Sequence, residues 1–354
     1  MFKLEKENYH KVLPLIKSQN ELSVYSVIAG ITPGEIYVNS ISNPTAVLIQ
    51  TSECNLIAGR TDDNEFNSSI KDELDFWDQI SPDTKEWGAL IPAIHQNKFI
   101  RSHVRRHYIL SEEKFNNHSS TLPEGYSMEE VIPERLREAN YNNAGKLLDW
   151  IGTWGDDENF CKYGVGSYIR KDNSILCWSI SDCSYQDKIA IGIHTDEHYR
   201  KRGLGAFVAA ETIRKCFNRG YKQVEWLCVD INKGSIAIAE KLGFTLSNKY
   251  DSFTSYPPIE NQTDLSEDEW LDWAKYYEGV INREDRLMME CLFAYIKANK
   301  PDKAYDILQA IYKNGQTVKY NMDGFIYYLH NIGMADQFDK DWFKKSEFEN
   351  NTLF

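Results

Sequence analysis

The sequence predicts an α/β protein in which a mixed, mostly antiparallel sheet with flanking helices is followed by an all-helical C-terminal region. Segments rich in β-branched residues alternate with helix-like segments over about the first 120 residues. A strand, a glycine-bearing loop, a helix and another strand follow one another between residues 164 and 253, and from residue 264 onward apolar residues recur at i, i+3 and i+4. The chain of 354 residues is longer than one hydrophobic core usually covers, so we expect three domains, at residues 1–118, 122–256 and 264–354.

The charge and the cysteines limit the classes of function. A formal net charge of -13 disfavours non-specific binding to nucleic acid or to an anionic membrane. The same field attracts a cationic small molecule such as a polyamine or an amino sugar, although solubility alone also accounts for an acidic chain. The N-terminus has no apolar run of the secretory kind, no stretch is apolar enough to span a bilayer, and the seven cysteines form no Cys-x-x-Cys pair. We therefore expect a cytoplasmic protein with no metal site and no disulfide framework.

The first domain is expected to alternate strands and helices, with Asn43-Pro44 as a turn signal between the first two strands. Its predicted elements, in chain order, are a short helix near residues 12–18, strands at 35–38 and 45–50, a helix at 64–80, a strand at 87–92, a helix near residue 97 and a strand at 107–110.

One basic cluster, Arg101-Ser102-His103-Val104-Arg105-Arg106-His107, closes this domain. Contact with phosphate is one interpretation of such a cluster. We favour a helix C-terminus followed by an edge strand, because cations offset the helix dipole and discourage edge-to-edge pairing. The polar stretch at residues 116–125 is then a linker to the second domain.

The C-terminal region has three predicted helices, at residues 264–281, 283–299 and 302–313, with Asn299-Lys300-Pro301 as a break. The segment around this break resembles a single tetratricopeptide unit. Because such units need stacked neighbours to bury their faces, we favour a helical cap on the preceding domain over a peptide-binding surface.

A loop in the second domain has the features of a phosphate site. The run Arg200-Lys201-Arg202-Gly203-Leu204-Gly205 joins a predicted strand at residues 188–195 to a predicted helix at 206–218. Gly203 and Gly205 let the backbone turn sharply and approach a ligand, and the free amides at the helix start then face that ligand. The helix dipole and the three cations favour a pyrophosphate group there.

This loop, Arg200-x-x-Gly203-x-Gly205, resembles the Arg/Gln-x-x-Gly-x-Gly/Ala loop of the GNAT acetyltransferase superfamily. Asn232, before a predicted helix that ends in Glu240-Lys241-Leu242-Gly243-Phe244, resembles the second signature of that superfamily. Together with the Trp226-x-Cys228 pair, these residues are most similar to the zwittermicin A resistance branch, and a weaker similarity reaches back to about residue 15.

The resemblance implies a GNAT-type central domain whose sheet is splayed between residues 189–195 and 224–228, so that acetyl-CoA enters the gap. The order of elements in the first domain then suggests a degenerate, acetyltransferase-like unit. Because that unit lacks the phosphate loop, we expect it to bind no CoA and to shape the acceptor site.

The resemblance also implies the roles of individual residues. The backbone of Ile193, His194 and Thr195 would hold the acetyl carbonyl and the pantetheine arm, and Asn232 would bond the pantetheine. The pyrophosphate of acetyl-CoA would be bound by a continuous run, Arg200, Lys201, Arg202, Gly203, Leu204, Gly205 and Ala206. The expected reaction is direct transfer of an acetyl group to the amine of a small, cationic molecule of the antibiotic, aminopolyol or polyamine type.

The usual acid and base of the superfamily are missing. The position of its common tyrosine is Ala239, and Ile189, Ala190 and Ile191 occupy the stretch where a glutamate is common. Ordered water can deprotonate an amine when no side chain is poised to do so. Four side chains are candidates, each with a structural alternative: Ser235, which we rank first, as a helix cap, Cys228 as a core residue, Glu225 as a solvated group and Asp230 as a cap or turn residue.

Other interpretations stay open. We expect His194 to pack in the core, and His198 and Tyr199 to shape the phosphate loop. A non-catalytic acyl-CoA sensor or scaffold, whose helical tail contacts a protein partner, is the main alternative to an enzyme. An acetyltransferase acting on a protein or peptide is a third reading, and a homodimer is compatible with each.

Overall fold

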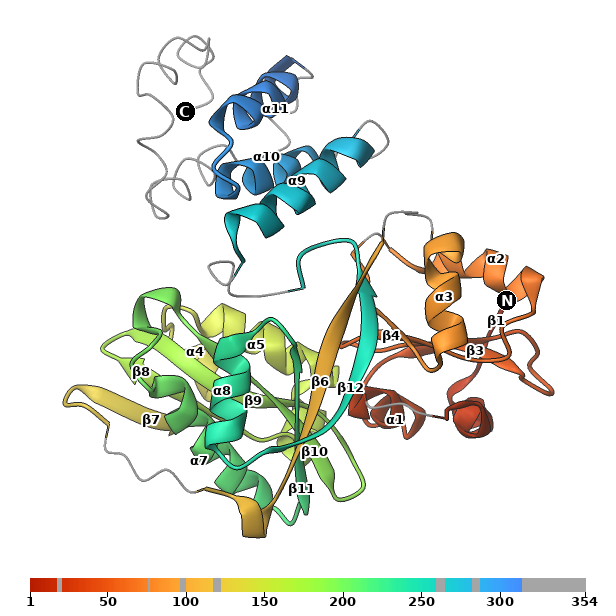
Figure 1. Cartoon of the computed structure of the whole chain (residues 1–354). Helices are drawn as coiled ribbons and strands as arrows, with labels where there is room; N and C mark the ends of the chain where they lie inside the picture. Colours follow the sequence, from red (N-terminus) through yellow and green to blue (C-terminus); the bar gives the residue numbers. More distant parts are fainter. Residues whose placement is uncertain are drawn as a thin grey trace. The chain divides into compact units, whose positions relative to one another are not determined.

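The computed structural model describes residues 1–17, 21–75, 77–95, 100–116, 122–258, 265–281 and 287–313 (Figure 1). The chain forms two compact units, Met1–Ile259 and Glu260–Phe354, and each is described by itself. Within the described residues, every helix is too short or too polar to traverse a lipid bilayer.

The first unit is built on one mixed sheet of twelve strands in the order β1-β2-β3-β4-β5-β12-β6-β11-β10-β9-β8-β7. The strands are β1 Phe2–Lys3, β2 Glu35–Val38, β3 Ala46–Gln50, β4 Asn55–Gly59, β5 Ile80–Pro82, β6 Arg101–Ser111, β7 Tyr126–Glu130, β8 Gly166–Lys171, β9 Ser174–Tyr185, β10 Lys188–Thr195, β11 Gln223–Val229 and β12 Thr245–Thr254. Its α-helices are α1 Leu22–Ile28, α2 Asn64–Glu73, α3 Lys85–Ile94, α4 Pro133–Glu138, α5 Ala144–Ile151, α6 Asp157–Tyr163, α7 Leu204–Asn218 and α8 Lys233–Lys241. The predicted mixed, mostly antiparallel sheet with flanking helices is confirmed.

The sheet opens in the same way at two places, where two neighbouring parallel strands pair over only three residue pairs. Strands β4 and β5 run parallel and pair over three residue pairs, from Asn55↔Ile80 to Ile57↔Pro82. Strands β10 and β11 run parallel and also pair over three, from Lys188↔Gln223 to Ala190↔Glu225. Each first strand leads into a helix, α2 or α7, and each second strand is followed by another, α3 or α8. The first half therefore repeats the element pattern of the second. The sequence predicted such a repeat but placed no strand at β4 or β5.

The two halves exchange their last strands. Strand β6, from the first half, pairs with β11 of the second half over seven residue pairs. Strand β12, from the end of the second half, pairs with β6 and also with β5 of the first half. Figure 1 shows β6 and β12 side by side between the halves. Because each half completes the sheet of the other, they form one continuous unit.

The two faces of the sheet are covered by different helices. On one face, α7 and α8 pack on β10 and β11, and Ile189, Ile213 and Trp226 lie in this core. On the other face, α1 of the first half packs against β9 and β10 of the second. There Leu22 contacts Cys183 and Ala190. Helix α1 thus spans the junction between the halves.

Several sequence predictions for the first half are wrong. Residues 87–92 lie in helix α3 and form no strand, because Thr84 caps this helix by accepting a hydrogen bond from the Trp87 N–H and because Trp87 and Ile91, four residues apart, are both buried. The helix predicted at 64–80 ends at Glu73, and the predicted helix near residues 12–18 is a 3-10 helix, Lys6–Leu15. The helix predicted near residue 97 lies outside the described residues.

The basic cluster at residues 101–107 does not form an edge strand. It belongs to β6, which lies inside the sheet between β12 and β11. Its arginines are neutralised within the protein: Arg105 pairs with Glu53 at 2.6 Å, and Arg106 pairs with Asp230 at 2.6 Å. The exchange of strands explains the error, because an interior position for this segment depends on residues more than 100 positions away.

The second unit is helical where it is described, with α9 Glu267–Val280, α10 Met288–Lys297 and α11 Pro301–Lys313. Ser266 and Glu269 form a capping box at the start of α9. Asn299 adopts a positive φ of 54° between α10 and α11, at the predicted break. Helix α10 packs against both other helices.

Candidate active site

The candidate site begins where β10 and β11 separate. Their last paired residues are Ala190 and Glu225. Beyond this vertex, β10 stays paired with β9 on its other side, from Ile191↔Ser181 to Thr195↔Cys177. Its remaining backbone edge therefore faces the opening. An unpaired strand edge offers N–H and C=O groups to an extended ligand.

The predicted phosphate loop follows β10 directly. The Asp196 side chain accepts a hydrogen bond from the His198 N–H and caps a short 3-10 helix, Glu197–Tyr199. Lys201 and Gly203 then adopt positive φ angles of 61° and 80°. This double reversal turns the chain into α7, with Gly203 at its N-cap.

The start of α7 has free backbone donors. Phe207 is the first residue of this helix whose N–H reaches a backbone acceptor in the described chain, the Gly203 carbonyl at 3.2 Å. The preceding amides have no intrahelical acceptor, as at any helix start. No side-chain cap occupies them within the described residues. With the dipole of a helix of 15 residues behind them, these amides suit an anion.

The two glycines of the loop are required for different structural reasons. Gly203 is needed for its positive φ, and a Cβ there would meet no atom within 4 Å. Gly205 is needed for packing, because a Cβ there would lie 3.0 Å from Ile193 Cδ1 and 3.1 Å from Ile238 Cδ1. Open space lies only in front of Gly203, whereas Gly205 brings α7 close to β10.

The cations of the loop also differ. Arg200 Nε donates to the Thr195 carbonyl at 3.0 Å and ties the loop to the end of β10. Arg202 donates to the His198 carbonyl at 3.0 Å, and its guanidinium lies 5.0 Å from the centre of the Tyr199 ring. Lys201 is exposed. Arg202, His198 and Tyr199 therefore interact within the loop, while Lys201 presents its charge to solvent.

Asn232 and Ser235 lie at the start of α8. The Asn232 side chain caps this helix by accepting a hydrogen bond from the Ser235 N–H at 3.0 Å. Ser235 is therefore not the cap. Its hydroxyl oxygen accepts a hydrogen bond from Trp226 Nε1 at 2.8 Å and lies on the side of the opening covered by α8.

The other three candidates for acid or base are in different environments. Cys228 is buried, and burial raises the pKa of its thiol despite a hydrogen bond with Ser235. Asp230 is held by Arg106 and by Lys249, and these hydrogen bonds lower its pKa. Glu225 is buried at 3% exposure, so the alternative of a solvated side chain is wrong.

Glu225 has a partner on β6 that was not predicted from the sequence. His107, on β6, places its Nε2 atom 2.9 Å from Glu225 Oε2. His103, Arg105 and His107 occupy alternate positions of one strand and so share one face of the sheet. The alternation of these residues was visible in the sequence. Because an edge strand was expected there, the three side chains were not expected to share a buried face.

His194 lies on the same face of β10 as an aromatic cluster. Its ring stacks on Trp178 at 4.2 Å between centroids. Burial, with smaller contributions from Arg200 and Lys146, lowers its pKa to about 4. Trp150 covers the neighbouring Gly192, where a Cβ would lie 2.8 Å from Trp150 Cζ3. His194 is thus packed against aromatic neighbours, as expected from the sequence.

The corresponding loop of the first half is unsuited to a phosphate. The Asp63 side chain already accepts a hydrogen bond from the Phe66 N–H at 3.0 Å, at the start of α2. Asp62 pairs with Arg60, and Glu65 adds another negative charge in the first turn. A carboxylate thus occupies the position that an anionic ligand would need.

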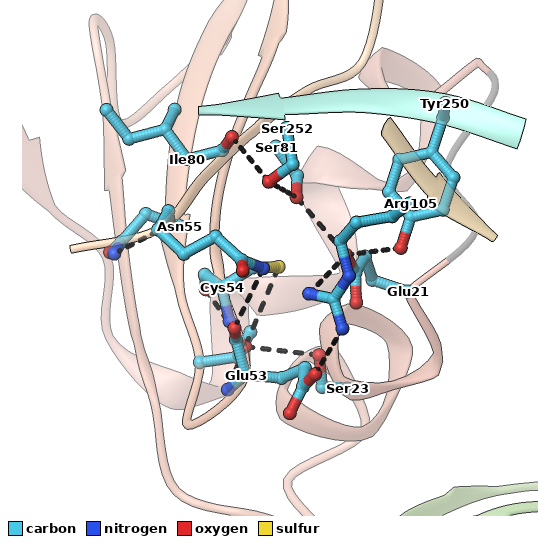
Figure 2. Close-up of polar contacts among 12 residues, drawn as sticks. Glu21, Ser23, Glu53, Cys54, Asn55, Ile80, Ser81, Arg105, Tyr250 and Ser252 are labelled. Atoms are coloured by element: carbon cyan, nitrogen blue, oxygen red, sulfur yellow. Dashed lines mark hydrogen bonds and ion pairs between the residues drawn. The ribbon is translucent and has the colours of Figure 1, made fainter. Parts of the chain in front are cut away.

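A buried ionic network lies at the junction, on the face covered by α1. Figure 2 shows Glu21 and Glu53 next to the guanidinium of Arg105. The nitrogen-to-oxygen distances are 3.4 Å to Glu21 and 2.6 Å to Glu53. Tyr250, on the exchanged strand β12, donates to Glu21 at 2.6 Å, and the Ser81 hydroxyl of β5 donates to the same carboxylate at 3.2 Å. The network therefore links both exchanged strands to the start of α1.

Known proteins are similar to this chain over the whole of this region. The model of the GNAT acetyltransferase family matches residues 13–253. An uncharacterized N-acetyltransferase, YdfB, of Bacillus subtilis (strain 168) is 24% identical over 241 residues, which cover 66% of this chain and 89% of that protein.

Two solved structures extend the comparison. A GCN5-related N-acetyltransferase-like protein from Streptococcus suis 89/1591 has a TM-score of 0.56 at 23% identity, covering 70% of this chain and 98% of that one. A tandem GNAT protein from the clavulanic acid biosynthesis pathway has a TM-score of 0.48 at 10% identity, covering 70% and 94%. With its family match over residues 13–253, the chain belongs to the GNAT acetyltransferase family and is an N-acetyltransferase.

Proposed function

We propose that this N-acetyltransferase transfers the acetyl group of acetyl-CoA directly to the amine of a small, cationic molecule of the antibiotic, aminopolyol or polyamine type. The observation that carries the proposal is the combination of the opening between β10 and β11 with the free amides at the start of α7. The residues fit the co-substrate: the edge of β10 at Ile193, His194 and Thr195 would hold the acetyl and pantetheine groups. The run from Arg200 to Ala206 would bind the pyrophosphate, and Asn232 the pantetheine.

The acceptor would enter from the face covered by α1. Acidic groups outnumber basic ones around the vertex on this face, with Glu21, Glu53, Asp182 and Glu225 against Arg105 and Lys188. Burial, together with the negative charge of Glu53, raises the pKa of Asp182 to about 7. A positively charged ligand at this face would favour the ionised form of these carboxyl groups and be attracted by it.

Further parts of the proposal rest on the sequence. The motifs at residues 200–205 and 232–244 support membership of the zwittermicin A resistance branch, and with it an antibiotic as the acceptor. The cysteines among the described residues are free thiols, which supports a cytoplasmic location. The first half would bind no CoA and would contribute α1 and β6 to the acceptor side.

A second candidate function is a non-catalytic acyl-CoA sensor. It is favoured by Ala239, which is fully buried at the position of the common tyrosine, and by Ser235, whose oxygen is engaged by Trp226. In this case the helices of the second unit would contact a protein partner. A third candidate function is acetylation of a protein or peptide. In that case the helices of the second unit would be needed for activity on the true acceptor.

Calorimetry with acetyl-CoA, followed by an assay of CoA release with a panel of polyamines, amino sugars and amine-containing antibiotics, tests the proposal. We expect binding of acetyl-CoA and release of CoA with at least one cationic amine. Tight binding without release from any amine would favour the sensor. Absence of acetyl-CoA binding by the folded chain would contradict both.

A further inference from the structure

We propose that His107 and Glu225 form a dyad that removes the proton from the acceptor amine, with His107 Nδ1 as the accepting atom. This inference rests on the proposed function and deepens it by assigning the base. The pair joins the halves, because His107 lies on β6 of the first and Glu225 on β11 of the second.

The position of Glu225 is the first argument. Glu225 is the last residue of β11 that pairs with β10, and its partner is Ala190. Paired residues of neighbouring strands point to the same face, so the carboxylate lies beside a methyl group at the vertex of the opening. Although β10 carries Ile189, Ala190 and Ile191 there, a buried carboxylate is present one strand away.

The hydrogen bonds fix the tautomer of His107. Glu225 Oε2 lies 2.9 Å from His107 Nε2, and Glu225 Oε1 accepts from Gln223 Nε2 at 2.7 Å. Because a carboxylate accepts hydrogen bonds, the dyad assigns the hydrogen to Nε2 and the lone pair to Nδ1. Nδ1 is buried and has no hydrogen-bond partner in the described part of the chain. A buried acceptor without a partner is costly in a native protein and calls for a functional reason.

The other ionisable groups around the dyad differ in their ability to accept a proton. The ionisable neighbours on this face are His103 and Arg105 on β6, Tyr250 on β12, Lys188 on β10, Asp182 and Cys183 on β9, Tyr25 on α1, and Glu21 and Glu53, which both pair with Arg105. Burial raises the pKa of Tyr25, Tyr250 and Cys183, which keeps them protonated at neutral pH. Arg105 and Lys188 are cations. Asp182 is the competing base and is included in the test.

The chemical step balances as follows. The ammonium group of the acceptor gives one proton to His107 Nδ1, and the resulting imidazolium is stabilised by its Nε2–H bond to the Glu225 carboxylate. The nitrogen lone pair forms a C–N bond with the acetyl carbon of acetyl-CoA as the C–S bond breaks. The second proton lost by the nitrogen is taken up by the CoA sulfur, and His107 returns its proton to water.

The first test reads the tautomer and does not depend on activity. Ring nitrogens of the full chain labelled with ¹⁵N-histidine are observed by NMR at pH 7.5, and the signal of His107 is assigned by its loss in His107→Gln. We expect a neutral ring with hydrogen on Nε2, and loss of this preference in Glu225→Gln. Hydrogen on Nδ1, or a charged ring from pH 6 to pH 9, would overturn the proposal.

The second test compares two amines as probes. Spermidine is positively charged at neutral pH and needs deprotonation, whereas hydroxylamine is largely uncharged. A positioned general base contributes about 10² to 10⁴ in rate, so His107→Gln should lower kcat/KM for spermidine about a hundredfold at pH 7. The loss with hydroxylamine should stay below about threefold, and raising the pH should restore part of the spermidine rate.

Controls separate this proposal from its alternatives. His10→Gln, at an exposed position far from β6 in sequence, should leave both rates unchanged. Equal loss with both amines in His107→Gln, or loss with spermidine in Asp182→Asn but not in His107→Gln, would overturn the dyad. If the wild-type chain releases no CoA from either probe, the NMR measurement of the His107 tautomer decides whether the dyad exists. Failure to bind acetyl-CoA would instead contradict the proposed function.

Discussion

At the scale of single residues, burial changes the ionisation of two histidines. Burial and the nearby Arg105 lower the pKa of His103 to about 3, and burial with Arg200 and Lys146 lowers that of His194 to about 4. Neither ring is positioned like His107, which has a carboxylate partner. Protonation of His103 and His194 is therefore unfavourable in the folded protein.

We expect acid to destabilise the protein through His103 and His194. Below pH 6.5 their unfolded forms take up protons while the folded forms stay neutral, so stability falls as the pH drops from about 6.5 toward 4. The slope is at most about 1.4 kcal/mol per pH unit for His103 and smaller for His194, whose ring is partly solvated. Urea unfolding between pH 4 and pH 7 should be less pH-dependent in His103→Phe and His194→Phe. The exposed His10→Phe serves as the control, and an equal slope in all three variants would contradict the assignment.

At the scale of elements, α7 depends on close contact with β10. Gly205 is the position of closest approach, where a Cβ would meet Ile193 and Ile238. The short loop before α7 is read easily from the sequence because its glycines, its cations and the following helix are contiguous. The opening between β10 and β11 was expected from the family resemblance. The opening between β4 and β5 was not, because neither strand was predicted.

Gly205→Val should destabilise the first unit. The added branches overpack the space between α7 and β10, which typically costs about 1 to 3 kcal/mol. The measurement is chemical unfolding followed by tryptophan fluorescence. Gly145→Val in the exposed part of α5, where a Cβ meets nothing within 4 Å, is the matched control and should cost less than about 1 kcal/mol. Equal stability of Gly205→Val and wild type would show that α7 is not packed in this way.

The sequence predicted the second half well and the first half poorly, for physical reasons. Residues 188–195 lie in β10 as predicted, because alternating apolar residues and a contiguous loop define this strand locally. Residues 87–92 were misread because a tryptophan followed by apolar residues suits a strand or a buried helix equally. The pair His107 and Glu225 could not be predicted, since 118 residues separate them and only the strand exchange brings them together.

At the scale of the whole molecule, the exchanged strands make the two halves mutually dependent. Arg105 on β6 is 5% exposed and lies between Glu21 and Glu53 of the first half, beside Tyr250 of β12. Removing one member of a buried ionic group leaves uncompensated charge in the interior. The stability of the entire first unit is therefore expected to depend on this network.

Arg105→Met should lower the free energy of unfolding by about 3 to 5 kcal/mol, because Glu21 would stay buried without its cation. Adding Glu21→Gln to this variant should recover part of the loss. Arg60→Met, which removes an exposed pair with Asp62, is the control and should cost far less than Arg105→Met. A loss for Arg105→Met no greater than that for Arg60→Met would contradict a stabilising role for the network.

The central claim, that acetyl-CoA binds at the start of α7, is tested most directly by calorimetry with acetyl-CoA on Gly203→Val and Gly220→Val. Both glycines have positive φ, 80° and 96°, and open space at Cβ, but Gly220 follows the opposite end of α7. The two valines therefore strain the backbone alike, and only Val at position 203 displaces the loop amides. Each charge-assisted hydrogen bond contributes about 1.5 to 3 kcal/mol, so losing several should weaken binding by at least about a hundredfold in Gly203→Val. Gly220→Val should bind like wild type, and circular dichroism should confirm that both variants fold. Unchanged affinity in a folded Gly203→Val variant would show that acetyl-CoA does not bind at this loop.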